Sequence, residues 1–249
     1  GTGEGMYLGG NNGRVIMSES VIALNHVHDT DNGVSQGDGI EVKQGSWGNV
    51  IAVNVVHDCN YPCILIYGTA GMPRNIVENN ICFRSGDNTL QVQGECIVRN
   101  NLAIAGGGNA FASQPHQGAP TGMTVVHNTF VNEGNAVRLS SWATGTNMVF
   151  ANNACYSQRD AALSVINSST GVIYAGNVSN GTVTSGIGGF QPGTGLADFV
   201  DLSWDGTHRN ARPGPTSALR GVAEATYATD RDLGFRPRTV PHTVGCHGP

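Results

Sequence analysis

Six short stretches decide the fold: VIALNHV (21–27), VIAVNVV (50–56), NIVENNI (75–81), CIVRNNL (96–102), TVVHNTF (124–130) and MVFANNA (148–154). In each stretch an apolar run leads to an asparagine and a second apolar run follows it. The period is roughly 25 residues, which is typical of stacked repeat units that share one core. We assign the equivalent asparagines to Asn25, Asn54, Asn79, Asn100, Asn128 and Asn152, and Gly176 takes the matching place in a seventh stretch, VIYAGNV (172–178).

Each unit is expected to consist of strands, because β-branched residues recur at every second position and Gly and Asn interrupt them. The equivalent asparagines would then form an internal ladder, with amides about 4.8 Å apart along the stack. A third strand completes each unit, and in NAFAS (109–113) we expect Ala110 and Ala112 to face the core and Phe111 to face outward. The third strands are GMYLG (5–9), GIEVK (39–43), CILIY (63–67), TLQVQ (89–93), NAFAS, AVRLS (136–140) and ALSVI (162–166).

This repeat resembles the right-handed parallel β-helix of the pectin-lyase-like superfamily. The resemblance implies an all-β solenoid of about seven coils with three parallel sheets. The coils are expected over residues 1–180, and residues 181–249 are expected to form a closing coil and capping tail of the same domain. The chain opens on a bare strand, so we expect the first coil to be covered by a further amino-terminal segment or by stacking against another chain.

Composition excludes several kinds of partner. The net charge of −5 and 12% charged residues offer no basic face for nucleic acid. No run approaches the roughly 18 apolar residues that a membrane span needs. The segment CNYPC suggests a local disulfide between Cys59 and Cys63, which would favour a secreted, extracellular protein. The alternative is that the cysteines are small buried hydrophobic residues.

The resemblance also implies that a polysaccharide binds along the outer face of the third strands. Amides, aromatic rings and charged groups on that face suit sugar recognition, although a plain solvated sheet face would have a similar composition. The candidate substrate-binding residues are Glu41, Gln91, Gln93, Phe111 and His116.

Acidic residues are concentrated in the loop at 28–43 and in the turn that is expected to stack on it. Such a density of hard oxygen ligands predicts a Ca²⁺ site. An acidic turn with side-chain caps is the alternative. The candidate metal ligands are Asp29, Asp31, Asp38 and Asp58.

Lys43 is the only lysine in the sequence, and it lies beside this acidic loop on the expected substrate face. A lyase that works by β-elimination must neutralise a uronate carboxylate, remove the proton at C5 and release the oxygen at C4. Neighbouring carboxylates alone would raise the pKa of Lys43 and weaken it as a base, so a bound cation would have to offset them. The candidate catalytic residues are Lys43, Arg138, Tyr67, His57 and Arg84.

The sequence thus predicts a Ca²⁺-assisted lyase acting on acidic glycans. Two alternatives remain open. One is a glycoside hydrolase that pairs Glu41 with Asp38 or Asp58. The other is a non-catalytic cell-surface solenoid that assembles through its coil ends.

Overall fold

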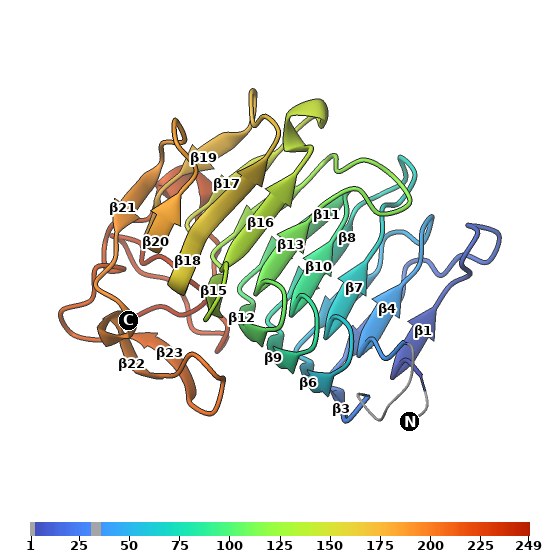
Figure 1. The fold of residues 1–249 in the computed structure, drawn as a ribbon, viewed down its shortest axis with the longest axis horizontal. Coiled ribbons are helices and arrows are strands. Elements are labelled where there is room, and N and C mark those ends of the chain that lie inside the picture. Colours follow the sequence, from blue (N-terminus) through green and yellow to red (C-terminus); the bar gives the residue numbers. More distant parts are fainter. Residues whose placement is uncertain (1–2, 31–35) are drawn as a thin grey trace.

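The computed structural model describes residues 3–30 and 36–249, and the chain winds through them as a parallel β-solenoid (Figure 1). The stack makes about six turns, close to the seven coils expected from the sequence. Successive turns place their strands in three parallel rows, and the strands in the first row carry the candidate site. The first row contains β1 (Met6–Leu8), β4 (Ile40–Val42), β7 (Ile64–Ile66), β10 (Leu90–Val92), β13 (Phe111–Ser113), β16 (Val137–Ser140) and the second half of β18 (Ala154–Ile166).

The second row is joined to the first through the long strand β18. It contains β3 (His26–His28), β6 (Val55–Cys59), β9 (Ile81–Ser85), β12 (Leu102–Gly106), β15 (Thr129–Asn132), the first half of β18, β20 (Asn177–Val183) and β21 (Phe190–Pro192). It ends at β20 and β21, which pair with each other. The third row forms a sheet of its own. It contains β2 (Val21–Ala23), β5 (Val50–Ala52), β8 (Asn75–Glu78), β11 (Cys96–Arg99), β14 (Thr124–Val126), β17 (Val149–Ala151) and β19 (Ile173–Ala175).

An asparagine ladder runs through the stack, but in a register that differs from the expected one. Each side-chain amide donates to the amide oxygen of the next turn at 2.9–3.2 Å. The same oxygens accept the backbone N–H of the preceding ladder residue at 2.9–3.0 Å. The ladder residues are Asn25, Asn54, Asn80, Asn101, Asn128, Asn153 and Asn177.

The assignments of Asn79, Asn100, Asn152 and Gly176 to the ladder were therefore wrong by one residue. The residue before each ladder asparagine turns the corner with φ between 54° and 61°. This left-handed conformation is easiest for glycine and asparagine, which explains the Asn-Asn pairs and the Gly-Asn pair. The residues at the corner are Leu24, Val53, Asn79, Asn100, His127, Asn152 and Gly176.

The corner asparagines face away from the core and hold the carboxyl-terminal tail. The Asn79 amide donates to the carbonyls of Asp232 and Leu233 at 3.0 and 3.1 Å, and that of Asn100 donates to Arg231 O at 2.8 Å. Asn152 exchanges two hydrogen bonds with the backbone of Glu224. The paired asparagines thus serve two purposes, one inside the coil and one outside it.

The core is apolar and continuous along the stack, and its alignment corrects the expectation for β13. Leu90 pairs with Phe111 and Gln91 pairs with Ala112, so Phe111 points inward and Ala112 takes the outward position. Phe111 is fully buried and stacks on Phe130 with ring centroids 4.8 Å apart. The assignment of Phe111 to the substrate face was wrong.

The six cysteines are buried free thiols, so the expected disulfide between Cys59 and Cys63 is not formed. Both sulfur atoms instead donate to backbone carbonyls, Cys59 to His57 O and Cys63 to Phe83 O. Their packing in the core agrees with the alternative that they are small hydrophobic residues.

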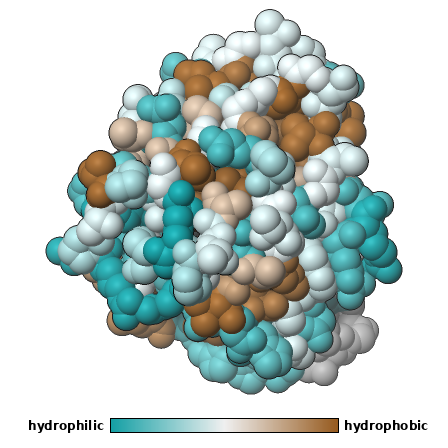
Figure 2. Space-filling model, turned by 90° about the vertical axis from the view of Figure 1, so that its left-hand side faces the viewer, coloured by the Kyte–Doolittle hydropathy of each residue, from teal (hydrophilic) through white to brown (hydrophobic). Residues whose placement is uncertain are grey.

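The tail after β21 covers the outer face of the second row. It includes the short helices η2 (Leu196–Asp198) and η3 (Ala225–Tyr227) and the antiparallel pair β22 (Phe199–Leu202) and β23 (Arg209–Pro213). Leu202, Leu219 and Val244 pack there on outward residues of the coils, such as Leu102 and Ile104. At the end of the stack that carries β21 and the tail, hydrophilic and hydrophobic side chains are interspersed (Figure 2).

Helix is scarce in the described part of the chain. One further short helix, η1 (Trp142–Thr144), follows β16. Across residues 3–30 and 36–249 no helix has the length and apolar character needed to cross a bilayer.

Candidate active site

A pocket of about 390 Å³ opens on the outer face of the first row, where β1, β4, β7 and β10 lie side by side. Parallel register stacks Tyr7, Glu41, Leu65 and Gln91 in one outward column at the centre of this face. The volume is at the lower end of the range usual for ligand pockets. The lining residues are Glu4, Tyr7, Asn11, Gln36, Asp38, Glu41, Lys43, Tyr61, Pro62, Leu65, Tyr67, Asp87, Gln91 and His116.

Lys43 lies at the centre of the site and is only 4% exposed. Its Nζ donates to Glu41 Oε1 at 2.6 Å and faces the Tyr67 hydroxyl at 3.5 Å. The ammonium also lies over the rings of Tyr7 and Tyr67, 4.9 and 4.5 Å from their centroids. Burial alone would lower the pKa of Lys43, but the hydrogen bond and the negative charge of Glu41 raise it above its ordinary value.

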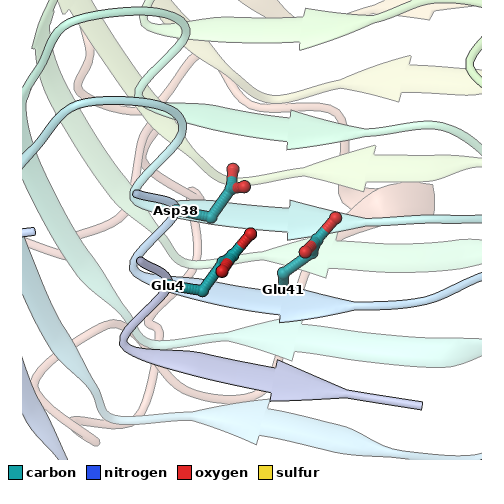
Figure 3. A group of neighbouring side chains, drawn as sticks. All are labelled: Glu4, Asp38 and Glu41. Carbon is teal, nitrogen blue, oxygen red and sulfur yellow. The ribbon is translucent and has the colours of Figure 1, made fainter. Parts of the chain in front are cut away.

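Three carboxylates gather beside the lysine: Glu4, Asp38 and Glu41. They project from the same side of the strands, with Glu4 and Asp38 just before β1 and β4 and Glu41 within β4 (Figure 3). One oxygen of each lies within 4.8 Å of the others. Burial first, and then the charges of Glu41 and Glu4, raise the pKa of Asp38 to about 7.

Asp38 is 5% exposed, and its Oδ1 is buried without a hydrogen-bond partner. A buried carboxylate oxygen of this kind is costly unless a proton or a cation compensates it. Hard oxygen ligands in close array suit a divalent cation such as Ca²⁺, which takes six to eight oxygens. The residues present therefore fit a cation held by Glu4, Asp38 and Glu41.

A loop after β13 brings His116 back across three turns to the pocket. Gln44 donates to Gln117 O at 2.8 Å, and Gln117 reaches Asn11 Oδ1 at 3.2 Å, so contacts with the first coils hold the loop in place. The His116 ring lies 4.9 Å from that of Tyr67. Burial, followed by the charge of Lys43, lowers the pKa of His116, which favours the neutral imidazole.

The side-chain amides of Gln91, in β10, and of Gln93, just after it, are held by hydrogen bonds to neighbouring residues. Gln91 Oε1 accepts from Asn88 Nδ2 at 2.7 Å, which orients the Gln91 amide. Gln93 does not line the pocket; its amide bridges Gly68 N and Ala119 O and holds the loop that carries His116. The residues of the expected set that the pocket brings together are Asp38, Glu41, Lys43, Tyr67, Gln91 and His116.

Other expected site residues lie elsewhere. Arg138, on β16, is on the same row but farther along the stack, where it donates to Gln114 Oε1. Asp58 and Arg84 belong to the second row and form a two-bond ion pair at 2.5 and 2.6 Å. Asp58 also contacts His57. None of these three residues lines the pocket around Lys43.

The expected metal set is divided in the same way. Asp38 lies in the pocket, whereas Asp58 is in the second row and Asp29 contacts His28 Nδ1 at 2.6 Å beside it. The expectation that Asp29, Asp38 and Asp58 form one site was wrong, because Asp29 follows β3 in the second row whereas Asp38 precedes β4 in the first. Asp31 lies outside the described residues.

Glu4 was missed in the sequence, although a signal for it exists. Glu4-Gly5-Met6 and Asp38-Gly39-Ile40 share an acid–glycine–apolar pattern two residues before the first inward side chain. A Cβ on Gly5 would lie 2.6 Å from Gly39 O, and one on Gly39 would lie 2.4 Å from Cys63 O. The glycines thus allow adjacent turns to approach closely, and this stacks the two acids.

The stacked parallel turns and the internal ladder define the chain as a parallel β-helix. Residues 1–153 match the family described as right-handed β-helix region, and the chain belongs to that family. No curated protein matches the sequence.

Proposed function

We propose that this chain is a secreted enzyme that cleaves acidic polysaccharides by β-elimination, with its centre at Lys43. The observation that carries the proposal is the position of the single lysine, which lies between two tyrosine rings and beside three gathered carboxylates. Membership of the β-helix family supports the polysaccharide substrate, since the outer face of the parallel rows is long and regular.

Charge explains why a cation belongs to the proposal. Glu4, Asp38, Glu41 and Asp87 line the pocket against one lysine. A polyuronate would be repelled by this excess of acids unless a cation neutralised it. Ca²⁺ held by Glu4, Asp38 and Glu41 would supply that charge and would stabilise the carboxylate of the substrate.

Residues of the chain itself would remove the C5 proton, protonate the leaving oxygen and bind the sugar. Lys43 is held as an ammonium by Glu41, so it would first release a proton to solvent when a bound cation offsets the carboxylates, and its neutral amine then takes the C5 proton. The electron pair of the C5–H bond forms the C4–C5 double bond, and the C4–O4 bond breaks. The Tyr67 hydroxyl, 3.5 Å from Lys43 Nζ, donates a proton to the departing O4. Gln91 offers its oriented amide to a sugar hydroxyl or carboxylate.

Turnover with defined substrates tests the proposal. Pectate, alginate and glycosaminoglycans are incubated separately with the enzyme, with Ca²⁺ or with a chelator, and absorbance of unsaturated uronate products is followed. We expect absorbance to rise with one of them, to require Ca²⁺ and to be lost in Lys43→Ala. Arg159→Ala, which removes an exposed ion pair with Glu133, is the matched control and keeps activity. Absence of signal with every polyuronate refutes the lyase.

A second candidate, a glycoside hydrolase, is favoured by the pKa of Asp38. A carboxyl group with a pKa of about 7 is protonated often enough to act as a general acid, and the adjacent Glu41 accepts a hydrogen bond from Lys43 Nζ at 2.6 Å. A pair of carboxyl groups, one of them a general acid, is the usual machinery of glycoside hydrolysis. Release of reducing ends from a neutral glycan without a rise in absorbance would select this candidate.

A further inference from the structure

Three histidines gather on the outer face of the second row, on the other side of the coil from Lys43. His26 and His28 are the outward residues of β3, and His57 lies beside them on β6, where it pairs with His28 in the parallel register. The ring centroids of the three imidazoles lie 4.6, 5.0 and 5.2 Å apart. Nothing in the proposed reaction uses this cluster.

The ring nitrogens are oriented by carboxylates. His57 Nδ1 contacts Asp58 Oδ2 at 2.5 Å, and His28 Nδ1 contacts Asp29 Oδ2 at 2.6 Å. A carboxylate accepts from Nδ1–H, so the lone pair of each neutral ring is on Nε2. A carboxylate behind the imidazole is also the usual support of histidines that ligate metals. His57 is held further by stacking on Phe83 at 4.5 Å.

His26 Nε2 and His57 Nε2 meet at 2.8 Å. In a tetrahedral site with metal–nitrogen bonds of 2.0–2.1 Å, two ligating nitrogens lie about 3.3 Å apart. The two rings therefore need to separate by only about 0.5 Å to accept an ion between them. His26 then carries its proton on Nδ1 instead of Nε2.

We propose that His26, His57 and His28 bind a late first-row divalent ion such as Zn²⁺, Ni²⁺ or Cu²⁺. His26 and His57 would provide the first two ligands, and His28, whose side chain is 44% exposed and whose ring centroid lies 4.6 Å from that of His26, would have to turn its ring to provide the third. Neutral imidazoles prefer these ions to Ca²⁺ and Mg²⁺. Asp29 and Asp58 place two negative charges nearby, and Arg84, paired with Asp58, places one positive charge. The net charge around the rings favours a cation.

The ion would link the first two turns of the solenoid, because β3 and β6 belong to successive turns. Binding to the folded chain alone raises the melting temperature with the ratio of free ion to Kd, and a shift of a few degrees is expected for a domain of this size. Stability therefore provides a readout that is independent of any enzymatic activity.

Calorimetric titration of the untagged, chelator-treated protein with ZnCl₂ and NiCl₂ tests the site. Excess Ca²⁺ is present throughout, so that the carboxylates of the Lys43 pocket are occupied. We expect one ion per chain, and at least a tenfold loss of affinity in His26→Gln and in His57→Gln. The melting temperature should rise with Zn²⁺ in the wild type and not in His57→Gln.

His208 provides the matched control, since it is an exposed imidazole that also contacts a carboxylate, Asp201, at 3.0 Å, in the β22–β23 hairpin. His208→Gln should leave the titration unchanged. Circular dichroism of each variant checks folding. The proposal is overturned if no saturable one-to-one binding occurs, or if His208→Gln weakens binding as much as His57→Gln.

Discussion

The ladder register predicts different losses of stability for two adjacent asparagines, because Asn101 lies in the internal ladder whereas Asn100 contacts the carboxyl-terminal tail. The side chain of Asn101 donates to Val77 O, Arg99 O and Asn128 Oδ1 and accepts from the N–H groups of Asn80. Asn101→Ala removes all of these bonds inside the core. The Asn80 backbone N–H is left buried without its partner, which costs about 1–3 kcal/mol, and each of the four other lost bonds costs about 0.5 kcal/mol. We expect a total loss of about 3–5 kcal/mol of unfolding free energy.

A double-mutant cycle separates the ladder from the tail contacts. Asn101 and Asn128 share a hydrogen bond, so their alanine variants should be coupled by about 1–2 kcal/mol. Asn100 is next in sequence but instead accepts from Arg238 at 3.0 Å and donates to Arg231 O. Asn100→Gly keeps the left-handed corner while removing these contacts, and it should combine additively with Asn128→Ala.

Urea unfolding followed by circular dichroism measures both cycles, provided that each variant shows one cooperative transition with an unchanged slope. Additivity of Asn101 and Asn128 within about 0.5 kcal/mol would contradict the ladder register. Coupling between Asn100 and Asn128 of the size expected for Asn101 would contradict it equally, because it would assign the internal position to the first asparagine of the pair.

Three further predictions follow from the pocket and the core. Burial raises the pKa of Asp38 to about 7 in the folded state, against about 3.9 in the unfolded state. The folded state therefore binds the proton more tightly, and the stability that this provides is lost as pH rises from about 4 to 7. The loss in unfolding free energy is at most about 4 kcal/mol. Asp38→Asn should remove this pH slope in urea titrations, and Ca²⁺ should flatten it in the wild type; a slope that persists in the variant refutes the assignment. Tyr67→Phe should lower kcat at least tenfold with little change in KM, because in the proposed reaction the hydroxyl protonates the leaving oxygen; unchanged kinetics would remove that role. Phe111→Ala should cost about 3–5 kcal/mol in urea unfolding, whereas a surface position would cost under about 0.5 kcal/mol.

The fold was predictable because each turn repeats the same physical pattern. Alternating apolar residues specify the strands, and the asparagine bend specifies the period, so the coil alignment emerges even with one-residue errors. Those errors have a physical origin. In Asn79-Asn80 both residues are amides, and the sequence does not distinguish a corner that needs positive φ from an inward position that needs a buried amide. Phe111 was misplaced because an alanine lies on either side of it.

The candidate site was predictable only where its residues lie on one row. Glu41, Lys43 and Tyr67 were grouped correctly because the strand register fixes their neighbours. The acids at 29 and 58 were assigned to the same site because they are close in sequence or in repeat position, yet the turn between rows carries them to another face. Sequence proximity within a solenoid turn does not imply proximity on its surface.

The fate of solvent oxygen tests the central claim most directly. A polyuronate that gives a positive absorbance assay is digested in water enriched in ¹⁸O with Ca²⁺ present, and the masses of the products are measured by mass spectrometry. Elimination at the Lys43 pocket predicts unlabelled oligosaccharides that have gained no water and end in an unsaturated uronate. Products that each carry one labelled oxygen, formed at an equal rate by Lys43→Ala, would contradict both the reaction and its place.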